Sequence, residues 1–422
     1  MSPDTDGEEE EYLSADLYLD LAVTLYEAGA TVQRVGDSVR WLAGSLGDEN
    51  VHLAVGYEVI ELSVHHRDHT ESRLYVLRDP VRVNLSVLHQ VSGILHRIPS
   101  YQGNIAAIRE DLIGIRTRPI IYPVWVIIAC TGIACAAFGW INHADLPALW
   151  VIWVSAVCGL SIRVRFGKDL NNLYLTTLMT ALSGGLCAAL LTPFSHTQTP
   201  QVALISSVLF LIPGAMLING GLDIIRDHTS CGIARLTSVF TQISIISGAL
   251  LIPLGMMTIT LQPQPAGDIM ILIPTMSLAA GIAACGFGVL FNTPVSVLAG
   301  CFICSFAARL VRETGIYAGA DPFFSRFLGM CIATVIAAGI GRYAHVPEVL
   351  LSVIAGIPMV PGLAMIQGLQ GLFTLAHSST MQQEQVLMYA VQQILFAGVA
   401  VLALVGGIIF PIIMIARKNM RI

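Results

Sequence analysis

Charged residues are scarce in this sequence, and cysteine is absent from its first 129 positions. Only 12% of the 422 residues are charged, and the mean hydropathy is +0.72. A chain of this length with so few charges is too apolar to be soluble, so most of it belongs in a lipid bilayer. All nine Cys lie after residue 129, inside or beside apolar segments, which excludes a disulfide framework in the polar N-terminal part.

Motifs for nucleotide and cofactor binding are also missing. The sequence has no Walker A motif, no dinucleotide fingerprint and no Gly-x-Ser-x-Gly element. An ATP-driven pump is therefore disfavoured, and we expect no cofactor and no nucleic-acid partner. The polar run 65–69 contains three His and one Asp, but neighbours on a hairpin point to opposite faces, so we expect no metal site.

The charges gather at the N-terminus. Residues 1–119 hold 29 of the 50 charged residues, and no secretory signal peptide is recognisable, so we expect a cytosolic N-terminal domain. Residues 1–11 predict an acidic, disordered tail, and residues 12–118 predict a small α/β domain. The predicted elements are helices over 12–47 with a break at Gly29-Ala30-Thr31, strands over 50–64 and 72–78, and helices over 84–97 and 101–113.

Ten apolar segments follow, each long enough to cross about 30 Å of hydrocarbon. They lie at 120–141, 147–163, 171–192, 201–222, 232–261, 268–290, 294–311, 324–341, 347–372 and 386–416. We divide them into two halves of five, residues 119–263 and 264–422. Because five is odd, the second half enters the membrane upside down. The sequence thus predicts a multi-pass α-helical membrane protein with about ten transmembrane helices in two five-helix inverted repeats.

Lys and Arg are distributed unevenly between the two sides that these spans define. With residue 119 in the cytosol, twelve basic residues flank the cytosolic ends and three flank the outer ends. This bias follows the positive-inside rule. The exceptions surround the loop after the seventh span: Arg309, Arg312 and Arg326.

A short motif occurs once in each half. LIPGAMLING at 211–220 and MVPGLAMIQG at 359–368 each place a Pro-Gly pair in mid-span, with a carboxamide and a Gly after it. Pro and Gly interrupt a membrane helix, and the freed backbone groups need protein, water or substrate as partners. Matched breaks predict a transporter with substrate near the bilayer midplane. The predicted substrate-binding residues are Pro213, Gly214, Asn219, Gly220, Pro361, Gly362, Gln367 and Gly368.

Each of these assignments has a structural alternative. Prolines also form plain kinks in packed helices, and Asn219 and Gln367 could make interhelical hydrogen bonds instead of holding a solute. Asp223 follows Asn219 by four residues and so shares its helix face. We predict that Asp223 carries a coupling proton with Arg235 as its partner, and the alternative is an ion pair at a cytosolic helix end.

Three stretches resemble the threonine/serine exporter (ThrE) family. They are LYEAGATVQRVGDSV at 25–39, LIPGAMLINGGLDIIRDHTSCGIARL at 211–236 and IPMVPGLAMIQGL at 357–369. The resemblance covers nearly the whole chain and implies ten spans, a cytosolic domain and export of small amino acids or related acids from the bacterial cytoplasm, driven by the proton motive force. One departure is Arg34-Val35-Gly36, where the family often has Arg-Val-Glu, although Asp37 follows.

These observations predict an exporter in the bacterial inner membrane that exchanges threonine or serine for protons. Its expected partners are a small solute (threonine, serine or a small carboxylate), protons and the lipid bilayer, and the sequence leaves homo-oligomerisation open. A succinate-like dicarboxylate exporter of the same fold is the alternative. A membrane metabolite sensor and a membrane-tethered hydrolase are alternatives from other classes, although residues 12–118 show no nucleophile–base pair for hydrolysis.

Overall fold

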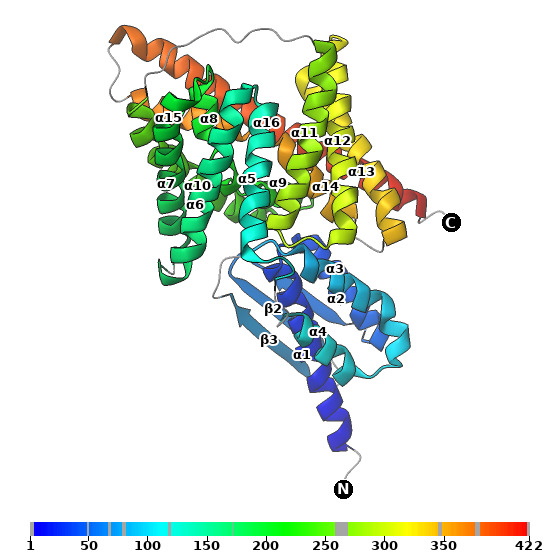
Figure 1. Ribbon diagram of the computed structural model, residues 1–422. Coiled ribbons are helices and arrows are strands. Elements are labelled where there is room, and N and C mark those ends of the chain that lie inside the picture. Colours follow the sequence, from blue (N-terminus) through cyan, green and yellow to red (C-terminus); the bar gives the residue numbers. More distant parts are fainter. Residues whose placement is uncertain are drawn as a thin grey trace.

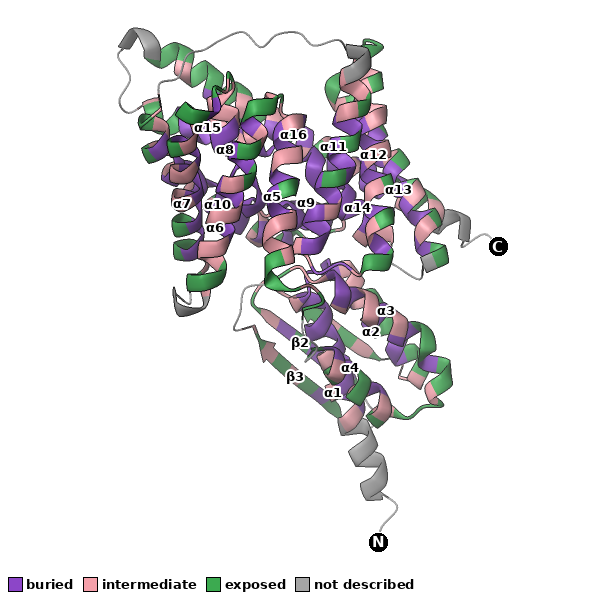
Figure 2. Ribbon diagram, viewed as in Figure 1, coloured by how far each residue is buried: buried purple, intermediate pink, exposed green. Residues whose placement is uncertain are grey.

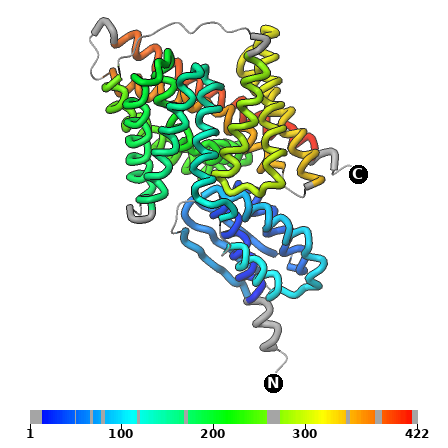
Figure 3. Tube along the Cα trace, in the orientation of Figure 1, coloured from blue at the N-terminus to red at the C-terminus, as the bar shows by residue number. Residues whose placement is uncertain are grey.

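The structure is a computed structural model that describes residues 4–48, 50–65, 69–77, 82–116, 120–170, 172–257, 269–344, 348–375 and 380–419. The N-terminal domain lies against one side of a helical membrane domain (Figure 1). We call this side of the membrane domain the near side, and the opposite side the far side. Figure 3 traces the same arrangement, with the N-terminal domain in blue and cyan below the bundle.

Helices cover one face of a three-stranded antiparallel sheet in the N-terminal domain. Its elements are α1 (Asp4–Glu27), α2 (Val32–Leu46), β1 (Val51–Val55), β2 (Val59–His65), β3 (Thr70–Val76), α3 (Leu85–Arg97), η1 (Ile98–Tyr101) and α4 (Ile105–Arg116). Ile60, Leu62 and Val64 alternate along β2 and are buried, while Glu61 and His65 are exposed on the other face. The predicted small α/β domain is confirmed.

Two boundaries of this domain differ from the prediction. Residues 50–64 form a hairpin instead of one strand, because the Gly56 N–H donates to the Val59 carbonyl at 2.8 Å and turns the chain back. We expected a disordered tail up to residue 11, but α1 already begins at Asp4. Glu is a good helix former, so the acidic run extends the helix. Part of the polar run 65–69 lies outside the described residues.

The membrane domain consists of long helices and two bent helix pairs. They are α5 (Val124–Ile141), α6 (Leu146–Leu170), α7 (Leu173–Ser195), α8 (Pro200–Ser206), η2 (Leu209–Leu211), α9 (Gly214–Ile225), α10 (Thr229–Gly255), α11 (Ile269–Leu290), α12 (Val295–Tyr317), α13 (Pro322–Ala344), α14 (Glu348–Gly356), η3 (Ile357–Met359), α15 (Gly362–Leu375) and α16 (Thr380–Asn419). Within the described residues, eight helices are long and apolar enough to span a membrane, and the number is ten if each bent pair forms one span.

The outer surface of the membrane domain is apolar, unlike that of a soluble protein. Large apolar side chains such as Trp125 and Phe194 stand on the outer surface at 72% and 77% exposure, where lipid would cover them. The buried residues of the bundle, shown in purple in Figure 2, include apolar side chains as well as many small residues and hydroxyl groups. This pattern confirms a multi-pass α-helical membrane protein.

The central helices α5 and α11 run antiparallel. The Ile121 N–H just before α5 donates to the Asn292 side chain just after α11, so the start of one helix lies beside the end of the other. The two helices approach closely at Gly286, where a Cβ would lie 2.5 Å from the Cys130 carbonyl oxygen. Only glycine permits this backbone contact.

Both predicted helix breaks are present. The segment Pro200–Leu211 meets α9 at 64°, and the segment Glu348–Met359 meets α15 at 50°. Pro213 and Pro361 stand at the two corners. Each proline lacks the N–H that would continue the helix across the corner.

Candidate functional site

The near side of α9 and α10 binds the turn between α1 and α2. Two backbone carbonyls of this turn, Gly29-Ala30-Thr31, face the membrane domain. The Asn219 amide donates to the Gly29 carbonyl at 2.8 Å, and the Arg235 guanidinium donates to the Ala30 carbonyl at 2.9 Å. Side chains that the sequence suggested for solute and proton binding thus hold a segment of the protein itself.

Asp223 and Arg235 form a fully buried ion pair at this contact. Arg235 Nη1 lies 3.0 Å from Asp223 Oδ2, and the two side chains are 2% and 0% exposed. The other carboxylate oxygen, Oδ1, accepts from the Val32 N–H at 2.9 Å, at the first residue of α2. The N-terminus of α2 adds partial positive charge there, which favours the carboxylate. Breaking a buried pair of this kind costs about 3–5 kcal/mol.

Tyr26, at the end of α1, completes the near-side cluster. Its ring lies against Arg235, with 5.0 Å from the guanidinium carbon to the ring centroid, and its hydroxyl is 3.3 Å from Cys231 Sγ. Burial raises the pKa of Tyr26 well above its ordinary value despite the opposing charge of Arg235, so the hydroxyl stays protonated at physiological pH. Tyr26 therefore offers Arg235 an uncharged aromatic face, which suits a cation–π contact.

Glycine shapes the turn that fits this site. Gly29 has φ of 87°, a left-handed conformation, and a Cβ there would lie 3.2 Å from the Val83 Cα. Thr31 then caps α2 by accepting from the Arg34 N–H. The turn leaves a cavity of about 40 Å³ at the interface, enough for a few water molecules but too small for a solute.

The N-terminal domain also contacts the second half of the membrane domain. The Leu85 N–H donates to the Phe291 carbonyl at 3.0 Å, and the Asn292 amide donates to Asn84 at 3.1 Å. Val349 and Leu350 of α14 line the small cavity beside the turn. The domain thus bridges the two halves, so movement of one half against the other would strain these contacts.

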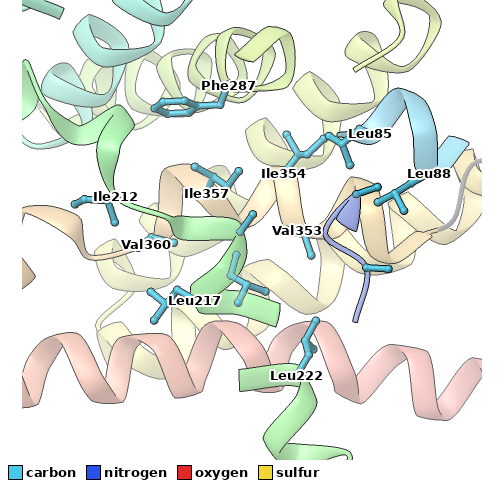
Figure 4. Close-up of a cluster of buried hydrophobic side chains, with 14 of the residues drawn as sticks. Leu85, Leu88, Ile212, Leu217, Leu222, Phe287, Val353, Ile354, Ile357 and Val360 are labelled. Carbon is cyan, nitrogen blue, oxygen red and sulfur yellow. The ribbon is translucent and has the colours of Figure 1, made fainter. Parts of the chain in front are cut away.

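The two helix breaks pack against each other. A Cβ at Gly362 would lie 2.7 Å from Ile212 Cδ1, and one at Gly214 would lie 3.6 Å from Val360. Figure 4 shows Ile212, Ile357 and Val360 in this buried apolar cluster. The two breaks thus meet through apolar side chains.

A larger cavity opens on the far side. Its volume is about 300 Å³, and it is lined by Gln201, Leu254, Gln367, Gln370, Gly371, Thr374, Gln385, Val386 and Tyr389. The position of Leu254 shows that this cavity lies on the far side, because α10 rises about 28 Å between Arg235 on the near side and Leu254. The described residues of the lining include four carboxamides and no charged side chain.

Gln370 is the most informative residue of this cavity. Its side chain is buried, at 4% exposure, and neither its amide nitrogen nor its amide oxygen has a hydrogen-bond partner in the described structure. An unpaired buried amide costs roughly 1–3 kcal/mol. A carboxamide offers both donors and acceptors, so Gln370 suits a ligand that presents both.

The structure separates the predicted residues into two groups. Asp223 and Arg235 meet as predicted, and Asn219 joins them on the near side. Gln367 lies in the far-side cavity, so the two carboxamides do not share one shell. The two predicted helix breaks lie between the near-side group and the far-side group. The roles of all these residues in substrate binding stay predictions.

Sequence reasoning missed Tyr26 and Gln370. A signal for Gln370 was present, since it follows Gln367 by three residues and so lies on a neighbouring part of the same helix face. Tyr26 and Asn292 act through contacts more than 170 residues away in sequence, which no local pattern reveals.

Comparison with known families identifies the chain. A sequence model of the threonine/serine exporter family (ThrE) matches residues 16–257, more than half of the chain, and a second model of threonine/serine exporters matches residues 276–414. The chain belongs to the threonine/serine exporter family. The first match includes both the α1–α2 turn and its binding site on α9 and α10, and the second includes α15.

Two curated bacterial proteins are more distant relatives of this exporter-family chain. Both carry the name "Probable succinate transporter subunit YjjP". The protein from Escherichia coli K12 is 25% identical over 36% of this chain and 59% of its own length. The protein from Klebsiella aerogenes is 25% identical over 52% of this chain and 84% of its own length. No solved structure matches the chain.

Proposed function

We propose that this protein exports threonine and serine by secondary active transport, and that the far-side cavity is the substrate site in its outward-open state. The observation that carries this proposal is the neutral, carboxamide-lined cavity with the unpaired Gln370. An amino acid presents an ammonium donor and carboxylate acceptors, and Gln367 and Gln370 can pair with both. A volume near 300 Å³ suits a small solute.

The transport cycle would alternate between two inverted halves. Two equivalent contacts support the repeat: the Gly159–Thr180 contact of α6 and α7 recurs as Ala308–Gly329 in α12 and α13, each residue 149 positions later. The antiparallel α5 and α11 agree with an axis in the membrane plane. Under this proposal the packed breaks separate at midplane during the cycle, and Pro213, Gly214, Pro361 and Gly362 contact the passing solute.

Coupling would use Asp223. As a carboxylate it holds both Arg235 and the Val32 N–H. A proton on Asp223 removes the charge that both partners need, which weakens the hold on the turn and favours an open near side. The N-terminal domain would lie in the cytosol of a bacterium, with the chain in the inner membrane, in agreement with the bias of Lys and Arg.

Flux in proteoliposomes tests the proposal. We expect uptake of labelled threonine and serine to grow with an imposed pH gradient, and we expect Asp223→Asn to lose the response to the gradient. Flux of succinate alone would mean that the substrate is a dicarboxylate, as the name of the two relatives says, and not an amino acid. If Asp223→Asn kept the wild-type response to pH, the coupling role would be wrong. Absence of flux for all three solutes would reject transport of this substrate class.

A further inference from the structure

Three arginines of the second half come together inside the membrane domain. Arg309 and Arg312 lie on α12, and Arg326 lies on α13. Their side chains are partly or fully buried, and Arg309 and Arg326 are each 5% exposed. Glu313 is the carboxylate in their midst. These are the residues that depart from the positive-inside pattern of the sequence.

Glu313 supplies one negative charge for three positive ones. One of its oxygens lies 2.8 Å from Arg309 Nε and also contacts Arg312. Arg326 has no hydrogen bond or ion pair with any described residue, and its Nε is buried without a partner. Among the described residues, the cluster therefore has an excess of two positive charges.

The guanidinium groups face protein, not lipid. Arg309 donates to the Ile141 carbonyl at the end of α5, at 3.4 Å, and lies 3.8 Å from the Met276 sulfur of α11. Arg326 lies over the Phe396 ring of α16, 5.6 Å from its centroid. The cluster thus sits where α5, α11 and α16 meet α12 and α13.

Among the residues that the structure describes, no carboxylate other than Glu313 pairs with these arginines. His143, in the connection after α5, has its pKa lowered by burial and by Arg309 and Arg312, with Glu313 opposing. Its imidazole is therefore neutral at physiological pH and adds no further cation. Two uncompensated guanidinium groups in a membrane protein are costly, and such groups mark paths for charged ligands.

We propose that Arg309, Arg312 and Arg326 form a binding site for a small solute anion with carboxylate groups, separate from the far-side cavity. Guanidinium groups bind carboxylates through two parallel hydrogen bonds, and Arg326 is free to do so. A dicarboxylate would balance the excess charge of two. Because the groups face the protein interior, a solute is favoured over a lipid headgroup. The site does not depend on the proposed transport of amino acids.

Thermal unfolding of the purified full-length protein in neutral detergent tests this site. We expect sodium succinate to raise the Tm of the wild type above that in sodium chloride of equal ionic strength. Arg326→Gln should weaken the succinate response by about tenfold or more in concentration, and Arg326→Lys should weaken it less, because lysine keeps the charge but loses the fork. Without succinate, Arg326→Gln should unfold at the wild-type temperature or above, because like-charge repulsion is relieved.

Matched variants decide between sources of the anion. Arg342→Gln, at the exposed opposite end of α13, should respond to succinate like the wild type. A succinate response that survives Arg326→Gln but is lost in Gln370→Leu belongs to the far-side cavity and overturns the proposal. Stabilisation by phosphatidylglycerol in phosphatidylcholine micelles, with none by succinate, would identify a lipid site instead. A large drop in the Tm of succinate-free Arg326→Gln would make Arg326 structural.

Discussion

The two broken helices α9 and α15 carry the same motif, yet they differ in what faces them. Asn219 and Asp223 on α9 are buried against the α1–α2 turn, where they bond to the Gly29 carbonyl and the Val32 N–H. Gln367 and Gln370 on α15 line an open cavity of about 300 Å³. The position of α15 that matches Asp223 is Gly371, where a Cβ would lie 2.8 Å from the Ala390 Cβ. Helix α9 therefore uses a charged and a polar side chain to bind the backbone of the turn, whereas α15 lines a neutral cavity.

In the proposed inverted repeat, this difference divides the work between the two halves. Both halves carry the Pro-Gly corner, which the proposed transport cycle requires at midplane. The side chains that follow the Pro-Gly pair differ between α9 and α15, and only those of α9 bind the N-terminal domain, which covers the near side. Each variant below removes one part of this asymmetry.

The largest effect is expected from breaking the near-side ion pair. Arg235→Gln leaves Asp223 buried without its cation and should cost about 3–5 kcal/mol of stability. Asp223→Asn should cost a similar amount. The double variant should lose less than the sum, because it leaves no uncompensated charge. Chemical unfolding of all four proteins measures the coupling, and additive losses would show that the two groups act independently.

Tyr26 tests whether its aromatic ring stabilises Arg235. Tyr26→Leu keeps most of the apolar volume but removes the ring, so we expect a loss of about 2 kcal/mol for a desolvated cation–π contact. Tyr26→Phe retains the ring and removes only the hydroxyl, with its contacts to Cys231 and to the Tyr57 carbonyl. Its loss should be clearly smaller. Equal losses for the two variants, in the same unfolding assay, would assign the effect to the hydroxyl.

Gln370 tests the far-side cavity, and stability and flux should move in opposite directions. Gln370→Leu removes an unpaired buried amide, so the protein should gain about 1–2 kcal/mol of stability. Threonine flux should fall, by about tenfold, because the ligand loses a donor and an acceptor. The control is Gln242→Leu on α10, which removes an amide bonded to Ser238 and should not stabilise. Unchanged flux in Gln370→Leu would exclude Gln370 from the substrate site.

The smallest effect concerns a carboxylate on the far side, outside both motifs. Burial raises the pKa of Asp145, but hydrogen bonds from Thr197, Gln198 and Thr199 outweigh it and hold the pKa below its ordinary value of 3.8. This contribution to stability is therefore complete above the unfolded pKa and is lost as pH falls through the folded pKa. We expect Asp145→Ala to cost about 1 kcal/mol at pH 7 and to differ less from the wild type near pH 3. If the difference in stability between Asp145→Ala and the wild type stayed constant across this pH range, the stabilising role of the hydrogen-bonded carboxylate would be wrong.

Local patterns in the sequence predicted most elements of the fold. Apolar segment length predicted ten spans, and the described residues contain eight such helices and two bent pairs that bring the number to ten if each pair is one span. Pro213 and Pro361 located both breaks, because this signal is local and has a steric cause. The hairpin at Gly56 was missed, since a continuous apolar alternation hides a turn of three residues.

The candidate site was only partly predictable. The spacing of Asp223 and Arg235 pointed to a pair, and the structure contains it. Nothing in the spacing showed that residues 29–32 would occupy the other side of that pair, because this contact joins positions about 190 residues apart. Likewise, helix periodicity placed Gln367 on a face of α15 but could not tell which side of the membrane that face would open to.

Cysteine labelling would test the central claim, a closed near side and an open far side, most directly. In a variant with the nine native Cys replaced, single cysteines would be placed at Gln385 in the far-side cavity and at Ala215 beside the turn. A membrane-impermeant maleimide should label Gln385→Cys from the far side, with protection by threonine. It should label Ala215→Cys from the near side only when Arg235→Gln frees the turn. Rapid labelling of Ala215→Cys with Arg235 present, or none of Gln385→Cys, would contradict the account.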